Sequence, residues 1–187
     1  RSSHLELDLA FSSFSKDVCL ERNIDKASIC RLQEADIWVL DLRTWICALR
    51  TDLALKCPEV VRRSLTFSMG LQLTDELTIK QLNSTWRNKS EATDVLSFPA
   101  LNDSFSYPDN ACVELGDIVV SVPTAQQQAK QQNHLLGSEL RWLVSHGFLH
   151  LLGWDHPNQQ LLQEMLTCQE YLLNLQGAFN FKEIKRD

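Results

Sequence analysis

Three of the five histidines in this chain of 187 residues lie together in the segment 146–156. His146 and His150 are four residues apart, so on a helix their imidazoles lie one above the other on the same face. Gly153 follows, and a glycine just after a helix can adopt the left-handed conformation that ends it and turns the chain back. That turn would bring His156 in as a third ligand. Three imidazoles with a fourth position open are typical of a catalytic zinc site rather than a structural one.

The same spacing occurs in the metzincin peptidases, whose general base is a glutamate directly after the first histidine. In this sequence that position is Gly147, so a peptidase would need a carboxylate base from elsewhere in the chain. Met165 falls in a helical apolar pattern, which indicates core packing rather than the Met-turn of those enzymes. Zinc also activates a bound water and polarises a phosphoryl oxygen, so hydrolysis of other substrates fits the three histidines as well.

Length and composition favour one domain, 1–187, with a single core. The formal net charge of −6 argues against a surface that holds nucleic acid by bulk electrostatics, so any RNA contact must be local. No apolar run approaches the roughly 20 residues of a membrane span, and the first residue is not Met, which indicates a trimmed N-terminus. The six cysteines lack any C-x-x-C pair and are interpreted as reduced thiols of a cytosolic protein. The candidate basic positions are Arg62, Arg63, Lys80, Arg87, Lys89, Lys130 and Arg141.

The apolar patterns predict an α+β fold: a mixed sheet of about four strands covered by about five helices, with the metal site on a C-terminal helix and the turn after it. Strands are expected over 5–11, 60–71, 93–99 and 115–121. Helices are expected over 34–57, 74–86, 123–132, from about 138 through His150, and over 158–175. The polar segment 12–33 is expected to be an insertion of unknown role, a loop with a short helix, and 176–187 a frayed tail.

Four blocks of the sequence, in the same order, resemble the bacterial YbeY family of rRNA maturation factors. The blocks are Leu82-Asn83-Ser84-Thr85-Trp86-Arg87-Asn88-Lys89, Thr93-Asp94-Val95-Leu96-Ser97-Phe98-Pro99, Leu115-Gly116-Asp117-Ile118-Val119-Val120-Ser121 and the histidine segment. The resemblance covers about residues 59–175. Trp86 and Trp154 stand where tyrosine is common in that family.

The resemblance implies a cytoplasmic, single-strand-specific endoribonuclease with one Zn²⁺ per chain, acting in 16S rRNA 3′-end maturation and ribosome quality control. It implies that His146, His150 and His156 are the zinc ligands and that Arg87 lies in the active-site cleft. The implied partners are the 16S rRNA precursor and the small ribosomal subunit or its proteins, without DNA and without a membrane.

Chemistry leaves alternatives at the individual residues. Arg87 could stabilise the charge that develops on a phosphodiester, or it could simply pair with Glu91 or Asp94. Asp155 could accept a ring N–H from a ligating histidine, or it could cap the final helix. The proton acceptor could be zinc hydroxide, Asp155 or a group on the substrate, and the nucleophile could be water or a ribose 2′-hydroxyl.

The aromatic residues near the motifs, Trp86, Phe98 and Trp154, are candidates for stacking on single-stranded RNA, although core packing is the commoner fate of a large ring. Two other functions stay open: a metal hydrolase with a different substrate such as a peptide, and a ribosome assembly factor whose zinc only stabilises the fold. The acidic charge suits the assembly factor. Three imidazoles would also accept nickel, copper or iron.

Overall fold

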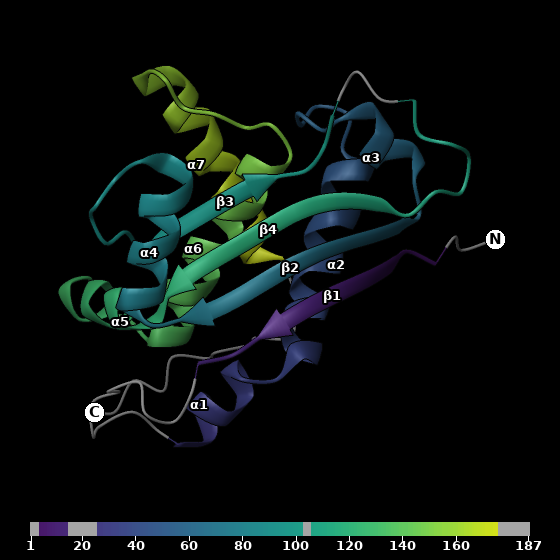
Figure 1. Ribbon diagram of the computed structural model, residues 1–187. Coiled ribbons are helices and arrows are strands. Elements are labelled where there is room, and N and C mark those ends of the chain that lie inside the picture. The colour runs from purple at the N-terminus through teal and green to yellow at the C-terminus, as the bar shows by residue number, and fades with distance from the viewer. Residues whose placement is uncertain (1–3, 15–25, 103–105, 176–187) are drawn as a thin grey trace.

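The computed structural model describes residues 4–14, 26–102 and 106–175, which form one four-stranded sheet flanked by helices (Figure 1). This confirms the predicted α+β class, with seven helices in the described part of the chain instead of about five. The strands are β1 (Glu6–Ser12), β2 (Thr66–Thr74), β3 (Val95–Pro99) and β4 (Val113–Ser121). The helices are α1 (Lys26–Leu32), α2 (Ala35–Thr51), α3 (Glu59–Arg63), α4 (Glu76–Arg87), α5 (Val122–Gln131), α6 (Leu136–Leu151) and α7 (Gln159–Asn174).

The sheet is mixed, with the strand order β1-β2-β4-β3. The strands β1, β2 and β4 run parallel to one another, and β3 pairs antiparallel with β4. Consequently β1 and β3 are the two edges of the sheet. Successive side chains of a strand point to opposite faces, so each strand contributes alternate residues to two different environments.

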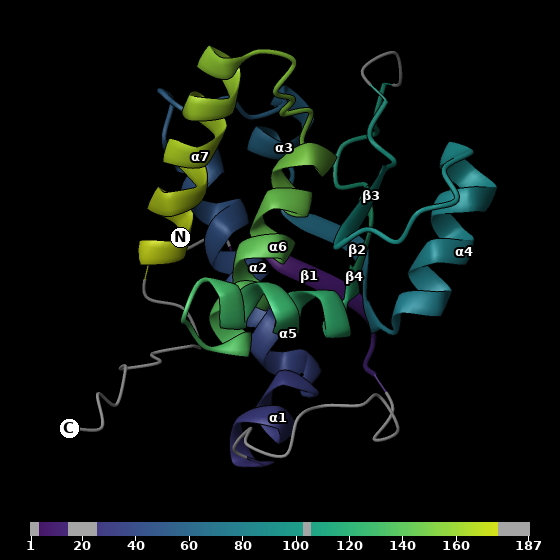
Figure 2. The ribbon, with the colours of Figure 1, turned by 90° about the vertical axis from the view of Figure 1, so that its left-hand side faces the viewer.

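One face of the sheet carries the main hydrophobic core. In Figure 2 the helices α2, α6 and α7 lie on this side of the sheet. The largest of its fully buried side chains are Trp38 and Trp45 of α2, Phe67 of β2 and Phe148 of α6. Met165 is also fully buried, which confirms the core role predicted for it. We call this the covered face.

The opposite face is covered by α4 alone among the described helices (Figure 2). Its hydrophobic cluster is small: Ile79 of α4, Leu96 of β3 and Val119 of β4, with Leu82 and Phe98 packed against them. The rest of this face consists largely of short or polar side chains from β1 and β2. We call it the open face.

The sequence prediction was wrong around the end of α2. The predicted helix 34–57 ends at Thr51, and the predicted strand 60–71 begins only at Thr66, because Glu59–Arg63 form the short helix α3. The reason is a tertiary contact: the Arg62 guanidinium donates to main-chain carbonyls of the last turn of α2 and of the turn after it. These bonds satisfy carbonyls that the helix end leaves without partners, and they override the strand propensity of the valines.

The remaining boundaries differ from the predictions by a few residues. Thr74, expected to open a helix, ends β2, and Asp75 is the N-cap of α4. The predicted short helix in segment 12–33 is α1, while 15–25 and the predicted frayed tail 176–187 lie outside the described residues. No helix in the described ranges is long and apolar enough to cross a membrane. The described cysteines are all free thiols, and Cys19 lies outside the described residues.

Candidate metal centre

The helix α6 places His146 and His150 on one face, one turn apart, and Gly153 ends the helical run with a φ of +81°. Between them, Gly147 faces the sheet. A Cβ at this position would lie 3.0 Å from the Cγ2 of Ile118 and 3.0 Å from the Oγ of Ser97. A glutamate there would collide with the sheet, so the position of the metzincin general base is used here for close packing of α6 on β3 and β4.

The three imidazoles converge as the sequence predicts. The possible ligand atoms of His146, His150 and His156 all lie within 4.8 Å of one another. The Nε2 atoms of His146 and His150 are 3.1 Å apart. A tetrahedral zinc with bonds of about 2.0–2.1 Å holds two nitrogens roughly 3.3 Å apart. The cluster therefore has the dimensions of a site for a single ion.

The hydrogen bonds of the other ring nitrogens select the tautomer that a metal needs. The Nδ1–H of His150 donates to the carbonyl of Trp154 at 2.8 Å. The Nδ1–H of His146 donates to the Oε1 of Gln169 at 3.3 Å. Gln169 is fully buried, and its Nε2 donates to the Trp142 carbonyl at 2.8 Å, which turns its oxygen toward the histidine. With both Nδ1 atoms protonated, both Nε2 lone pairs face the centre of the cluster.

The electrostatics favour neutral, metal-binding imidazoles. Burial lowers the pKa of His146 below its usual 6.5, and the neighbouring charge of His150 acts in the same direction. Burial likewise lowers the pKa of His150, helped by His156 and by the guanidinium of Arg87. A lower pKa means that protons compete less with a metal for the Nε2 lone pair.

The turn that carries His156 is fixed to the rest of the molecule by Trp154. This side chain is only 9% exposed, and its Nε1 donates to the carbonyl of Lys56 at 3.1 Å. The ammonium of Lys56 in turn donates to the carbonyl of Gly153. Trp154 thus anchors the metal-site turn, and its ring is not available for stacking on RNA.

Asp155 lies in the same turn, where its carboxylate contacts the backbone and does not cap α7. The cap of α7 is Asn158, whose Oδ1 accepts from the backbone N–H of Leu161, so the predicted capping role of Asp155 is wrong. In the described structure, Gln169 and Trp154 hold the ring N–H groups of the two helical histidines. The Oδ1 of Asp155 accepts from the backbone N–H of His156 at 2.8 Å. Burial is the largest influence on His150 and lowers its pKa, while the hydrogen bond to the Trp154 carbonyl and the charge of Asp155 act in the opposite direction.

Arg87 comes from the helix of the open face, and its charge acts on His150 of the metal centre. It is the last residue of α4, and its Nη2 donates to the main-chain oxygen of Ser97 in the edge strand β3 at 3.1 Å. The hydroxyl of Ser97 donates to the carbonyl of Gly147 in α6 at 3.3 Å, so β3 connects the arginine to the histidine helix. Among the described residues Arg87 forms no ion pair with Glu91 or Asp94, the alternative that the sequence left open.

Two residues of this site were not identified from the sequence. Gln169 carried a usable signal, because it falls on the apolar face of α7, four residues after Met165 and three before Leu172, where a polar side chain needs a buried partner. Ser97 carried no usable signal in the sequence, since its role depends on the strand register.

Of the predicted basic positions, Arg62 and Arg141 serve internal contacts: Arg141 Nε lies 2.8 Å from the Oδ2 of the fully buried Asp41.

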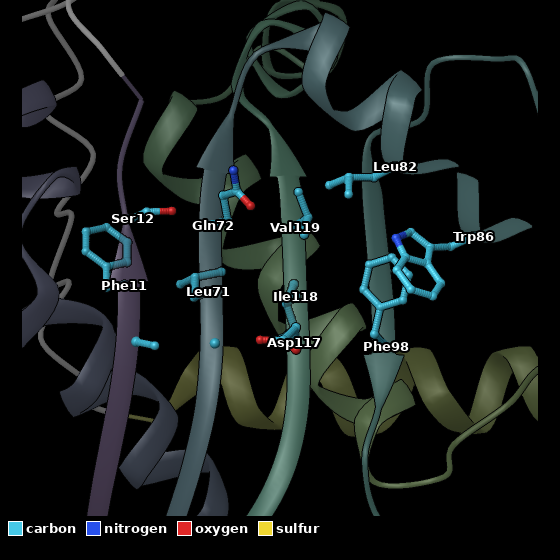
Figure 3. Close-up of a pocket in the computed structure, with 12 residues that line it drawn as sticks. Phe11, Ser12, Leu71, Gln72, Leu82, Trp86, Phe98, Asp117, Ile118 and Val119 are labelled. Atoms are coloured by element: carbon cyan, nitrogen blue, oxygen red, sulfur yellow. The ribbon is translucent and has the colours of Figure 1, made fainter. Parts of the chain in front are cut away.

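The other two aromatic candidates lie together on the open face. Trp86 of α4 is 69% exposed, and Phe98 of β3 is half-buried. Both line a groove of about 630 Å³ between α4 and the sheet, drawn in Figure 3. Phe98 packs against the small hydrophobic cluster of this face, whereas Trp86 is largely exposed, so the expectation of core packing does not hold for Trp86.

Comparison with known proteins identifies relatives over nearly the whole chain. The family model described as Endoribonuclease YbeY matches residues 41–177. Endoribonuclease YbeY of Prochlorococcus marinus (strain MIT 9313) is 58% identical over 93% of this chain and 92% of its own length. The protein of the same name from Synechococcus sp. (strain CC9311) is 50% identical over 91% of this chain and 96% of its own length. The solution structure of TM1509 from Thermotoga maritima covers 87% of this chain and 86% of its own, with 21% identity and a TM-score of 0.48.

Proposed function

Because the chain belongs to the YbeY family, we propose that it is a zinc-dependent endoribonuclease that cleaves single-stranded RNA. The observation that carries the proposal is the cluster of three imidazoles with a guanidinium close enough to lower the pKa of one of them. The names of the family model and of the relatives favour RNA over a peptide as the substrate. The packing of Gly147 against the sheet also speaks against a peptidase, because the position of its general base is a glycine at which even a Cβ would be in tight contact with the sheet.

The donor set fits one zinc ion, which His146, His150 and His156 would hold. Zinc supplies Lewis-acid polarisation of a phosphoryl oxygen and activation of a water. The protein contributes the fixed direction of the lone pairs: the amide of Gln169 and the carbonyl of Trp154 each hold a ring N–H on the far side of the imidazole. Such outer partners typically change metal affinity by 10–100-fold.

Arg87 would bind and orient the scissile phosphodiester. A guanidinium has five N–H donors. Within the described structure, the guanidinium of Arg87 forms one hydrogen bond, to the carbonyl of Ser97. That bond fixes the direction of the side chain and leaves donors for paired hydrogen bonds to phosphate oxygens. Negative charge grows on those oxygens during attack, so the arginine stabilises the transition state more than the ground state.

Asp155 would accept the proton of the nucleophile. Its Oδ1 holds the backbone of His156, which directs the carboxylate next to the metal centre and leaves Oδ2 for the proton. The products identify the nucleophile: 2′,3′-cyclic phosphate ends require attack by the ribose 2′-hydroxyl and rule out direct attack by water. In either case Asp155→Asn should slow cleavage while leaving the bound metal in place.

In the cell we propose the 3′ end of the 16S rRNA precursor as the substrate, on or near the small ribosomal subunit in the cytoplasm. The family assignment supports this role, and the free thiols suit a reducing compartment. With a net charge of −6, the chain needs local RNA contacts or a protein partner for docking.

The test compares metal content and RNA cleavage in four proteins: the wild type, His150→Ala, Arg87→Ala and Arg43→Ala. Arg43 lies on α2, where it contacts His4, so its replacement is a matched arginine control. We expect about one zinc per wild-type chain, cleavage of single-stranded but not duplex RNA, and loss of metal in His150→Ala. Cleavage should fall at least about 100-fold in Arg87→Ala with its metal retained, and stay within about twofold in Arg43→Ala.

Circular dichroism of each variant shows whether the fold is intact. Cleavage that is unchanged in both His150→Ala and Arg87→Ala would come from a contaminating nuclease and would overturn the proposal in favour of an assembly factor. Peptide cleavage that disappears in His150→Ala would instead support a peptidase.

A further inference from the structure

The groove on the open face is built from two rows of residues that run across the sheet. Ala10, Gly70, Asp117 and Phe98 are successive partners in the first row, and Ser12, Gln72, Val119 and Leu96 in the second. Leu82 and Trp86 of α4 form the wall beside Phe98 (Figure 3). The volume of about 630 Å³ is that of a small-molecule site and is ample for one nucleobase.

The wall of the groove is aromatic and exposed. Trp86 keeps 69% of its surface in contact with solvent although apolar residues of the same helix are buried against the sheet. An exposed indole beside a phenyl ring offers flat apolar surface, on which unpaired bases stack regardless of their sequence. The wall therefore fits a planar aromatic ligand.

The floor of the groove is shaped to hold a carboxylate. A Cβ at Gly70 would lie 2.0 Å from the Oδ1 of Asp117, so only glycine lets this carboxylate lie over the backbone of β2. Asp117 is the direct antiparallel partner of Phe98, and such partners have Cβ atoms about 4.5–5.5 Å apart. A ring stacked on the aromatic wall would thus present one edge to the carboxylate.

The charge of the groove distinguishes a base from a phosphate. Of the described residues that line it, Asp117 is the one with a charged side chain. A carboxylate repels phosphate and only accepts hydrogen bonds. Among the four RNA bases, guanine offers two adjacent donors, N1–H and N2–H₂, on its Watson–Crick edge, which match the two oxygens of a carboxylate.

Neighbouring residues of α4 and of the edge strand β3 connect the groove to the metal centre. Trp86 precedes Arg87 in α4, and Phe98 follows Ser97, whose carbonyl accepts from Arg87. Ser97 faces α6 and Phe98 faces the groove, as alternate residues of a strand do. A single-stranded RNA that crosses the edge of the sheet at β3 would bring a phosphate to Arg87 and a neighbouring base to Trp86.

We propose that this groove is a base-binding subsite, which holds an unpaired guanine of the RNA next to the phosphodiester at Arg87. The inference rests on the proposed function for RNA as the ligand, but binding of RNA in the groove can be tested without cleavage. Trp86 and Phe98 would stack on the base, and the carboxylate of Asp117 would accept hydrogen bonds from its N1–H and N2–H₂ groups.

Binding of labelled single-stranded RNA is measured in the His150→Ala background, in which the RNA should stay intact. Trp86→Ala should weaken binding about tenfold, and Trp86→Phe should restore it to within about threefold. The matched control is Leu77→Ala, since Leu77 is 66% exposed on the same helix but does not line the groove. Its affinity should equal that of the parent.

Two further measurements separate a base contact from a phosphate contact. The slope of log Kd against log salt should be unchanged in Trp86→Ala and should fall by about 0.7 in Arg87→Ala, because only the latter loses a phosphate contact. Oligomers with guanine replaced by adenine at each position in turn should reveal one position at which guanine binds about tenfold better. Asp117→Asn should abolish that preference.

Equal RNA affinities of Trp86→Ala and Leu77→Ala would overturn the inference and leave the open face to a protein partner. A wild type that cleaves RNA together with this result would refute the subsite and keep the nuclease. A guanine preference lost in Asp117→Asn, with no cleavage by the wild type, would keep the subsite and refute the nuclease.

Discussion

The two faces of the sheet differ in how closely their side chains are packed. On the covered face, three helices bury large side chains such as Trp38, Trp45 and Phe148, and the buried polar groups of the metal-site helices are matched by partners. On the open face a single helix leaves Leu77 and Trp86 more than 60% exposed. Metal ligands must be held within a fraction of an ångström, which needs close packing. Binding of single-stranded RNA needs accessible surface instead.

Arg87 and Ser97 connect the helices of the two faces. The arginine belongs to the helix of the open face, but its hydrogen bond is to the edge strand whose Ser97 hydroxyl contacts the histidine helix on the covered face. This division predicts that changes under α6 and α7 act through stability or metal affinity, while changes at Trp86 and Arg87 of α4 act mainly through RNA binding and cleavage.

The largest effect on stability is expected from the buried ion pair between α2 and α6. Asp41 is fully buried, and its two oxygens accept from the Nε and Nη2 of Arg141. Asp41→Ala removes the carboxylate that accepts both of these hydrogen bonds from a guanidinium that is only 11% exposed. We expect a loss of about 3–5 kcal/mol in the free energy of unfolding, measured by urea denaturation.

The comparison of faces requires a carboxylate control on the other side of the sheet. Asp117→Ala on the open face should change the free energy of unfolding by less than about 0.5 kcal/mol. If Asp41→Ala does not fold at all, Asp41→Leu combined with Arg141→Met should recover a folded protein, because a buried pair can often be replaced by apolar groups. Equal stabilities of the two single variants would contradict the division between the faces.

A smaller effect, on metal affinity, is expected from Gln169. Gln169→Met keeps the volume of the side chain but removes the acceptor that holds the Nδ1–H of His146. The zinc affinity, measured by competition with a chelator, should fall by 10–100-fold, or about 1.4–2.7 kcal/mol. Gln163→Met, on the exposed side of the same helix, should bind zinc as the wild type does. An unchanged affinity in Gln169→Met would mean that the tautomer of His146 does not need this amide.

The difference between the faces also explains what the sequence could predict. The ligand triad follows from local spacing, since His146, His150 and the glycine-terminated turn need only helical geometry to converge. The α+β class follows from alternation and helical periodicity for the same reason. The turn after α2 was mispredicted because it is held by Arg62 from outside the predicted helix, a contact that no local pattern encodes.

The groove illustrates the same limit. The small floor residues Ala10 and Gly70 and the carboxylate of Asp117 are far apart in the sequence, and only the strand order β1-β2-β4-β3 aligns them in one row. Likewise, capping of α7 was one of the two alternatives that the sequence left open for Asp155, but Asn158 lies at the position where the helix begins. Local chemistry predicted that a cap was needed there, and the length of the metal-site turn decided which residue supplies it.

The smallest effect is expected at the N-terminus of α4, where Asp75 accepts from the backbone N–H of Thr78 at 2.7 Å. This hydrogen bond lowers the pKa of Asp75 below its usual 3.8, so its stabilisation is complete above about pH 5 and is lost as the pH falls through the lowered pKa. Asp75→Ala should cost about 0.5–1 kcal/mol at pH 7 in urea denaturation, and the difference from wild type should shrink in acid. Asp75→Asn retains an uncharged cap and should lose no stability from this position in acid. A difference between wild type and Asp75→Ala that stays constant down to pH 2 would show that the charge plays no part in holding α4, and with it Trp86 and Arg87, on the open face.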